Sequence, residues 1–141
     1  MLRKLRQFCK SGRRRCRKTI ASGRSMVLYG DYGLMFVDSC GRVHERQLEA
    51  SRMAVRNATD KVGRLIQRRR ANVTITSKSS SVGRGKGKGD IDYKVDNISE
   101  GDILFELAGV SYEVARRGFQ KAIARLPGRY KMVSRLCYNL V

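Results

Sequence analysis

The chain has 141 residues, of which 31 are lysine or arginine and 12 are aspartate or glutamate, so its net charge is +19 at pH 7. Hydrophobic residues make up 41% of the sequence, which suffices for one folded domain and excludes a wholly disordered chain. Such a charge would destabilise a compact free monomer, so we expect a polyanionic partner: RNA, DNA or an anionic membrane. No run of about 18 apolar residues is present, which argues against a membrane-spanning helix.

The charges are unevenly distributed along the chain. Residues 1–24 contain ten Lys or Arg, residues 61–89 contain nine, and seven more follow Glu113, in each case without an acid. Seven of the twelve acids lie between Asp90 and Glu113, where Lys94 is the only cation. The chain therefore has three basic blocks and one acidic stretch, and we predict that the acidic stretch faces away from the polyanion.

Residues 1–24 are predicted to be a basic N-terminal arm. They show no apolar periodicity, so the arm would order only on a polyanion. The stretch is too polar for a secretory signal, whereas its Arg-rich, acid-free composition is typical of an organellar transit peptide. The candidate nucleic-acid contacts of the arm are Arg13, Arg14, Arg15, Arg17 and Lys18.

Residues 25–141 are predicted to form one domain that begins with a pair of short strands. Apolar runs at residues 26–29 and 34–37 flank a Gly-Asp-Tyr-Gly turn and suggest a hairpin or a kinked strand pair. Apolar residues at helical spacing then predict a helix over residues 45–61. Gly63 is placed to end that helix in the left-handed conformation.

The rest of the domain alternates further strands with a second helix. Ser111 is a plausible N-cap for this helix, and Pro127 would end it after Leu126. Its cations would also suit a membrane surface, but a core-facing helix explains its apolar face more simply. Short strands joined by turns, with helices between them, predict the fold class α+β, a mainly antiparallel sheet with two helices on one face. The later strands are expected at residues 65–69, 73–76, 91–95, 103–107 and 130–136.

Residues 83–89, the glycine-lysine loop, form the most informative segment. Four glycines alternate there with three cations. Because glycine lacks a Cβ, this backbone can lie close to another surface while the cations supply positive charge, which suits a phosphate-rich surface. The alternative is a solvated basic linker. No Ser or Thr follows a Gly-Lys pair, so the segment is not a nucleotide-binding P-loop, and its spacing does not fit a dinucleotide motif. The candidate contacts are Arg84, Lys86 and Lys88.

Two further groups of residues could contact nucleic acid. Arg68, Arg69 and Arg70 are predicted to form another basic face, with a solvated charge run as the alternative. Tyr29 and Tyr32 could stack on bases, although tyrosines beside a hairpin more often pack within the protein.

We expect no catalytic site, no metal and no cofactor. His44 is the sole histidine and has no evident catalytic partner, and a histidine before a helix is more often a capping or surface residue. Asp90 and Asp92 flank a strand and more simply balance the nearby basic loop. The four cysteines are scattered without a C-x-x-C pair, which favours free thiols in a reducing compartment. They are Cys9, Cys16, Cys40 and Cys137.

The order of these pieces resembles the large-subunit ribosomal protein L-sixteen family of bacteria and organelles. Residues 29–34, Tyr-Gly-Asp-Tyr-Gly-Leu, look like the family's Phe-Gly-x-Phe-Gly-Leu, and residues 46–52 look like its Arg-Gln-Ile-Glu-Ala-x-Arg helix start. Residues 85–89 match its Gly-Lys-Gly-Lys-Gly loop outright. Residues 101–110 and the second helix, with its Leu-Pro end, also fit. Together with the arm, the resemblance covers about residues 8–135.

The resemblance implies a hammerhead-type α+β fold bound to large-subunit rRNA near the base of the central protuberance, and a role in subunit assembly without catalysis. The implied partners are rRNA, neighbouring ribosomal proteins and, transiently, tRNA, and no homo-oligomer is expected. The loop and the arm would point toward the peptidyl-transferase centre and the aminoacyl-tRNA site. The loop residues placed there are Arg84, Gly85, Lys86, Gly87 and Lys88. A free-standing basic RNA-binding protein outside the ribosome is the alternative.

The chain departs from the family pattern in three places. Gly83 stands where the family has a functional arginine, and Arg84 follows one residue later. Residues 71–75 replace a proline-bearing stretch, and residues 68–70 are arginines where the family is more apolar. Such divergence favours an organellar ribosome, and we expect a mitochondrial one, with a plastid or the bacterial cytoplasm as alternatives. The family-like arm begins near residue 1, which leaves little room for a cleaved presequence.

Overall fold

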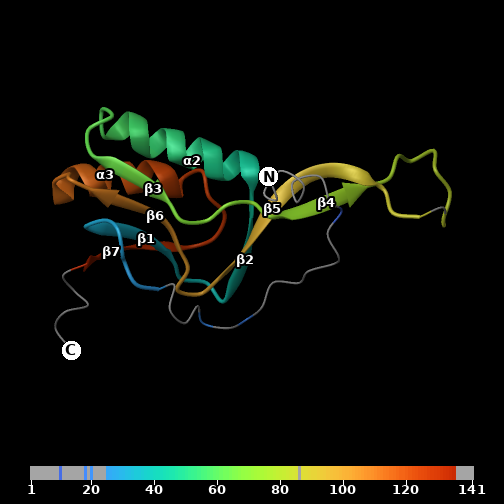
Figure 1. The fold of residues 1–141 in the computed structure, drawn as a ribbon, viewed down its shortest axis with the longest axis horizontal. Coiled ribbons are helices and arrows are strands. Elements are labelled where there is room, and N and C mark those ends of the chain that lie inside the picture. Colours follow the sequence, from blue (N-terminus) through green and yellow to red (C-terminus); the bar gives the residue numbers. More distant parts are fainter. Residues whose placement is uncertain (1–9, 11–17, 19, 21–24, 86, 136–141) are drawn as a thin grey trace, which may run out of the picture.

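The computed structural model describes residues 10, 18, 20, 25–85 and 87–135, and within them it has two helices and seven strands (Figure 1). The helices and the antiparallel pairing of the strands confirm the predicted α+β class. The helices are α2 (Glu45–Ala58) and α3 (Tyr112–Ile123). The strands are β1 (Tyr32–Phe36), β2 (Cys40–His44), β3 (Arg64–Gln67), β4 (Val73–Ser77), β5 (Asp90–Ser99), β6 (Ile103–Ala108) and β7 (Tyr130–Ser134).

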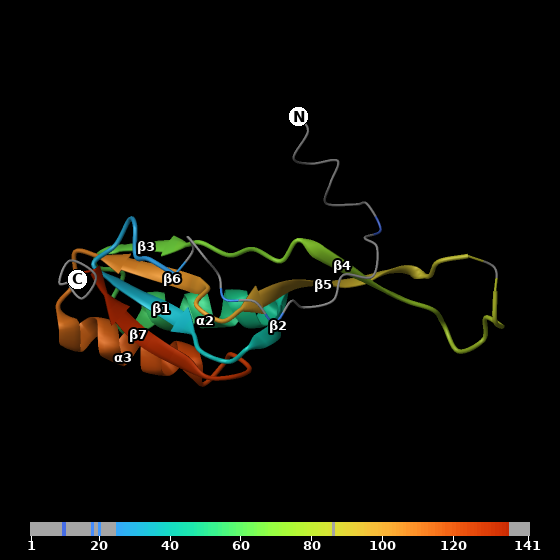
Figure 2. The ribbon, with the colours of Figure 1, turned by 90° about the horizontal axis from the view of Figure 1, so that it is seen from below.

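The strands are divided between two sheets. One has four strands in the order β3-β6-β1-β7, and α2 and α3 lie together on one of its faces (Figures 1 and 2). The other has three strands in the order β2-β5-β4. The long strand β5 pairs with β4 in a hairpin that projects from the body of the domain, as Figure 2 shows. The glycine-lysine loop connects these two strands, so the fold holds it away from the core.

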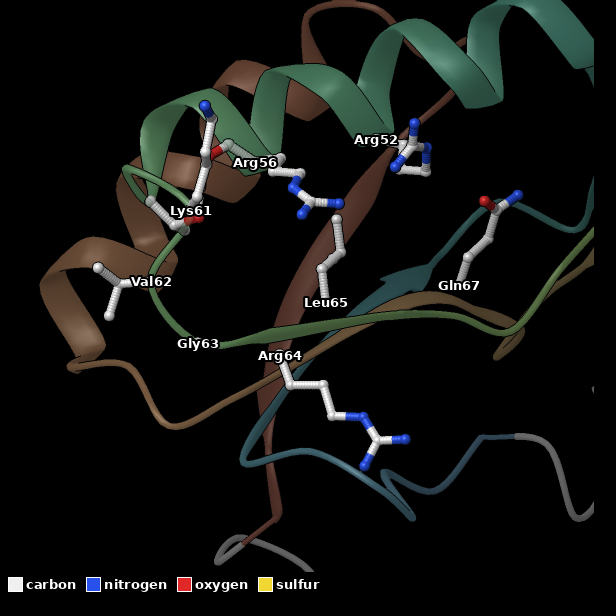
Figure 3. A pocket seen from close by; sticks show the side chains of 9 residues that line it. Arg52, Arg56, Lys61, Val62, Gly63, Arg64, Leu65 and Gln67 are labelled. Atoms are coloured by element: carbon white, nitrogen blue, oxygen red, sulfur yellow. Dashed lines mark hydrogen bonds between the residues drawn. The ribbon is translucent and has the colours of Figure 1, made fainter.

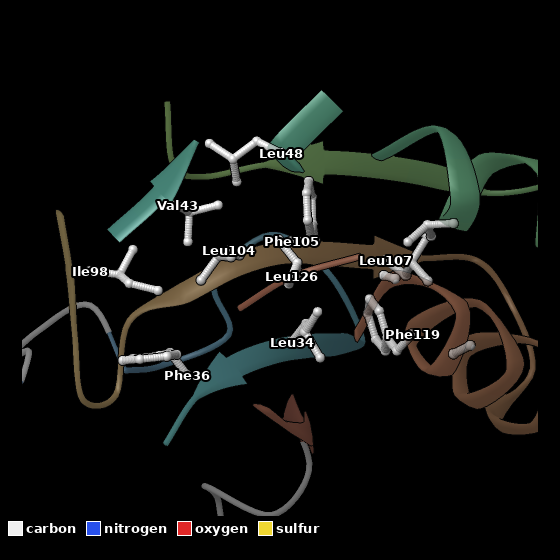
Figure 4. Close-up of a cluster of buried hydrophobic side chains, with 13 residues drawn as sticks. Leu34, Phe36, Val43, Leu48, Ile98, Leu104, Phe105, Leu107, Phe119 and Leu126 are labelled. Atoms are coloured by element: carbon white, nitrogen blue, oxygen red, sulfur yellow. The ribbon is translucent and has the colours of Figure 1, made fainter. Parts of the chain in front are cut away.

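The hydrophobic core lies between the helices and the four-stranded sheet. Phe36 of β1, Phe105 of β6 and Phe119 of α3 are each at most 1% exposed, and their side chains belong to one cluster (Figure 4). Burying an aromatic or aliphatic side chain of this size stabilises a fold by about 1.5–3 kcal/mol. The helical spacing of apolar residues that predicted α2 agrees with the packing, because Leu48 and Val55 of this helix are buried in the same cluster.

Helix α2 begins with a cap made by His44. The Arg46 N–H donates to His44 Nδ1 at 3.0 Å, and the His44 N–H donates to Gln47 Oε1 at 2.9 Å. These two bonds satisfy amides that a helix start otherwise leaves without partners. Of the two alternatives for His44, a capping or a surface residue, the structure shows the capping one.

The end of α2 differs from the expectation. The helix stops at Ala58, and Asp60 and Lys61 themselves adopt left-handed φ angles of 49° and 63°. Gly63, with φ of 77°, follows this turn instead of ending the helix. A Cβ at Gly63 would lie 2.7 Å from the Ala108 carbonyl oxygen, so the glycine allows close approach between the turn and the end of β6.

Two strand predictions were wrong. Residues 26–29 are not a strand, because backbone N–H groups of this segment donate to the Glu106 carboxylate instead of to a neighbouring strand. Residues Cys40–His44, for which we predicted no strand, form β2, which pairs along its whole length with the far end of β5. That pairing is non-local, so local sequence does not reveal it.

Candidate nucleic-acid interface

The glycines at the tip of the β4–β5 hairpin are surrounded by open space. A Cβ added to Gly83, Gly85 or Gly87 would meet no heavy atom within 4 Å. Gly85 and Gly87 have φ of 90° and 83°, which other residues rarely adopt. Arg84 and Lys88 are exposed, and Lys86 lies outside the described residues. The loop therefore presents backbone and cations outward.

The base of the loop is tightly packed. A Cβ on Gly89 would lie 2.2 Å from the Ser77 carbonyl oxygen, a distance that no real contact sustains. The two strands of the hairpin approach each other here only because residue 89 is glycine.

Gly89→Ala is expected to open the base of the hairpin and to cost about 1–3 kcal/mol of local stability, because the added methyl group must displace backbone. Hydrogen exchange of the β4 and β5 amides measures this loss of local stability, because a global unfolding curve does not detect local opening of the hairpin. Gly83→Ala is the matched control and should leave exchange unchanged, because its Cβ meets open space. Equal protection in both variants would contradict the expectation.

Cations at the loop also contact its backbone. Lys78 Nζ donates to the Gly85 carbonyl oxygen at 2.6 Å. Lys10 Nζ donates to the Lys88 carbonyl oxygen at 3.2 Å and lies 3.3 Å from Asp90 Oδ1. The fold thus brings a residue of the basic arm to the base of the glycine-lysine loop. Of the predicted arm contacts, Lys18 is described and exposed, whereas Arg13, Arg14, Arg15 and Arg17 lie outside the described residues.

The arginines at residues 68–70 have different surroundings from those we expected. Arg68 Nη1 lies 2.7 Å from Glu106 Oε1, and the two side chains are 13% and 0% exposed. Arg69 Nε and Nη2 lie 2.8 and 2.9 Å from the two oxygens of Asp96, which is also buried. Removing one partner from such a pair leaves a buried charge uncompensated. Two of these arginines therefore serve the fold, and Arg70 is the exposed member.

The same contacts correct the interpretation of the acidic stretch. Three of its seven carboxylates do not face solvent, because Asp96, Asp102 and Glu106 are buried at 4%, 1% and 0% exposure. Their partners come from the neighbouring basic block, at Arg68 and Arg69. The stretch neutralises interior arginines as well as contributing surface charge.

The two candidate stacking tyrosines differ in environment. Tyr32 packs edge-on against Tyr112, with ring centroids 6.0 Å apart, which is packing within the protein. Tyr29 is 65% exposed, and the Arg68 guanidinium carbon lies 6.0 Å from its ring centroid. Tyr29 is therefore the one of the two that is available for stacking on a base.

A second basic surface is a cleft between α2 and β3, shown in Figure 3. We did not predict it, because its lining comes from a helix, a turn and a strand that are apart in the sequence, and only the four-residue spacing of Arg52 and Arg56 indicated a shared face. Its volume is about 240 Å³. Hydrogen bonding from Arg52 holds the pKa of Glu49 below its ordinary value, so Arg52 is already paired. The lining residues are Arg52, Arg56, Thr59, Lys61, Val62, Gly63, Arg64, Leu65 and Gln67.

Other kinds of site find little support among the described residues. No three His, Cys, Asp or Glu side chains are grouped there to hold a metal ion. The ring of His44 stacks on that of Tyr93 at 4.7 Å, in addition to capping α2. Cys40 is a free thiol. In the part of the chain that the structure describes, the helices are too short or too polar to cross a membrane.

Comparison with known proteins gives a family that agrees with this geometry. The family model described as ribosomal protein L16p/L10e matches residues 3–133. The large ribosomal subunit protein uL16 of Albidiferax ferrireducens is 37% identical over 117 residues, which cover 83% of this chain and 84% of that protein, and uL16 of Polaromonas naphthalenivorans gives the same values. The uL16 protein of Delftia acidovorans is 36% identical over 116 residues, covering 82% and 83%. The chain belongs to the ribosomal protein L16p/L10e family.

Proposed function

We propose that this chain, a structural constituent of the large ribosomal subunit and not an enzyme, binds rRNA through its glycine-lysine loop and its basic arm. The observation that carries the proposal is the loop itself, which stands at the tip of a projecting hairpin with three glycines that meet no packing neighbour. Lys10 at the base of the loop links the arm to the same region. Cations in such a setting neutralise phosphates and release counterions.

The finer position is part of the proposal. The loop lies near the aminoacyl-tRNA site and the peptidyl-transferase centre, at the base of the central protuberance, and contacts tRNA transiently. The support is the family loop motif together with the reach of the hairpin beyond the core. The loop residues assigned to this position are Arg84, Gly85, Lys86, Gly87 and Lys88, and the further rRNA contacts are Arg13, Arg14, Arg15, Arg17, Lys18 and Arg70.

Arg84 is proposed to replace the arginine that the family has one residue earlier. Packing does not explain the glycine at residue 83, because a Cβ there would meet open space. Arg84 is exposed in the same loop, and the glycines on both sides of it allow its side chain to be redirected on contact. A guanidinium group can contact phosphate from either position.

We place the chain in a mitochondrial ribosome. The support is its divergence: 36–37% identity to the bacterial relatives named above, the displaced loop arginine and the interior arginines at residues 68 and 69. A plastid or bacterial ribosome is the alternative. Fractionation of cells with an antibody to this chain distinguishes the compartments.

Sucrose-gradient sedimentation of a native extract across a salt series tests the ribosomal function. We expect the chain to sediment with large subunits and to be released only at high salt, because phosphate contacts weaken steeply as salt rises. If the chain stays at the top of the gradient in low salt, it is a free RNA-binding protein that shares only the fold.

A further inference from the structure

The cleft between α2 and β3 has an arrangement of cations that neither the loop nor the arm shares. In Figure 3, Arg52 and Arg56 extend from α2 over β3, where Leu65 and Gln67 point toward them, while Arg64 extends from the opposite side of the strand. Lys61 stands at the end of the cleft where α2 stops. Helix, turn and strand thus contribute to one basic depression.

Only part of its positive charge is neutralised from within the described residues. Arg52 is paired with Glu49. No carboxylate of residues 25–85 or 87–135 lies within ion-pair distance of Arg56 or Lys61, and the cleft is lined without any acid. By contrast, the part-buried Arg68 and Arg69 of the same chain each have a carboxylate partner. Arg56 and Lys61 of the cleft therefore receive no counter-charge from the part of the chain that the structure describes.

The edge of β3 adds backbone donors. β3 is the edge strand of its sheet, and the Arg68 N–H donates inward to the Leu104 carbonyl oxygen. Because backbone groups alternate along an antiparallel strand that pairs without a register shift, the N–H groups of Leu65 and Gln67, together with their carbonyl groups, face away from β6 toward the edge of the sheet. Backbone N–H groups beside arginines are common partners of phosphate oxygens.

We propose that this cleft binds the phosphodiester backbone of RNA, as a second contact surface separate from the glycine-lysine loop. The inference rests on the proposed rRNA-binding function and extends it to the α2–β3 face. Its volume of about 240 Å³ is below the roughly 300–1,000 Å³ typical of small-molecule sites, so it suits a phosphate group with part of its ribose. An acidic peptide added to the β3 edge is the competing occupant.

The test measures binding of the full chain to single-stranded poly(U) across a salt series. Arg56→Gln with Lys61→Gln should make the slope of log affinity against log salt shallower by about 1.4, since each lost phosphate contact removes about 0.7. Between about 50 and 200 mM salt, wild-type affinity then falls about sevenfold more than that of the variant. Poly(U) should also protect Lys61 from acetylation, as read by mass spectrometry.

Two controls separate this effect from loss of charge in general. Arg56→Lys with Lys61→Arg keeps both cations and should keep the wild-type slope. Arg117→Gln with Lys121→Gln removes two exposed cations of α3 outside the cleft, and its slope should also stay at the wild-type value. A cleft variant with the wild-type slope, an equal loss in the α3 variant, or unprotected Lys61 would each overturn the proposal.

A further outcome identifies the competing occupant. If Lys61 in intact large subunits crosslinks to a protein and not to RNA, the cleft binds a peptide and the inference is wrong. The poly(U) measurement does not depend on the ribosome. A cleft variant that keeps the wild-type slope would therefore contradict only the inference about the cleft. The sedimentation experiment alone decides the proposed function.

Discussion

Glu106→Gln is expected to lower the free energy of unfolding by about 3–5 kcal/mol, because the substitution removes the charge from a buried ion pair. Glu106 is fully buried on β6, where one oxygen lies 2.7 Å from Arg68 Nη1. The other accepts N–H groups of Tyr29 and Gly30 at 2.7 and 2.8 Å. The carboxylate therefore holds the segment before β1, the strand β6 and the residue after β3 together. Urea denaturation of the full chain measures the loss.

The matched control for this substitution is Glu100→Gln, which changes an exposed glutamate after β5 and should stay within about 0.5 kcal/mol of wild type. Arg68→Met combined with Glu106→Gln should cost less than the sum of the single variants, because no lone charge is left behind. A loss below about 1 kcal/mol for Glu106→Gln, or strict additivity, would show that the pair contributes little.

Lys86→Ala with Lys88→Ala is expected to impair large-subunit maturation or translation while leaving the fold intact. The loop makes few packing contacts, so removing two of its cations takes away phosphate contacts without touching the core. The chain should be released from large subunits at a lower salt concentration than the wild type. The slope of log affinity against log salt should be shallower by about 1.4–1.8 if both lysines contact phosphate. Gradient profiles, a translation assay and thermal unfolding measure the three effects.

The control for the loop variant is Arg117→Ala with Lys121→Ala, which removes the same charge from the exposed side of α3. This control should show normal subunit profiles. Normal profiles and normal translation in the loop variant would instead mean that the loop is a solvated linker. A lowered unfolding temperature in the loop variant would point to a folding defect and would remove the support for a direct contact.

Local sequence patterns determined a large part of this protein. Helical spacing fixed the core faces of α2 and α3, because amphipathic periodicity records which side of a helix is buried. The position of His44 before a helix predicted a capping or surface residue rather than a catalytic one, and the structure shows the cap. The glycine-lysine loop was recognisable because alternating glycine and lysine suits neither a core helix nor a buried strand.

Only the tertiary structure decided which cations remain outside. Arg68 and Arg69 look like surface charges in the sequence, yet their partners Glu106 and Asp96 lie 38 and 27 residues away and are buried. The pairing of β2 with β5 and the cleft formed by α2 and β3 are non-local in the same way. Local sequence patterns do not predict such contacts, because the residues involved are far apart in the chain and meet only when the strands pair and the core forms. Local sequence patterns therefore predicted a basic α+β domain with an exposed loop. Tertiary packing determined which arginines form ion pairs with buried carboxylates and which cations stay exposed on the surface.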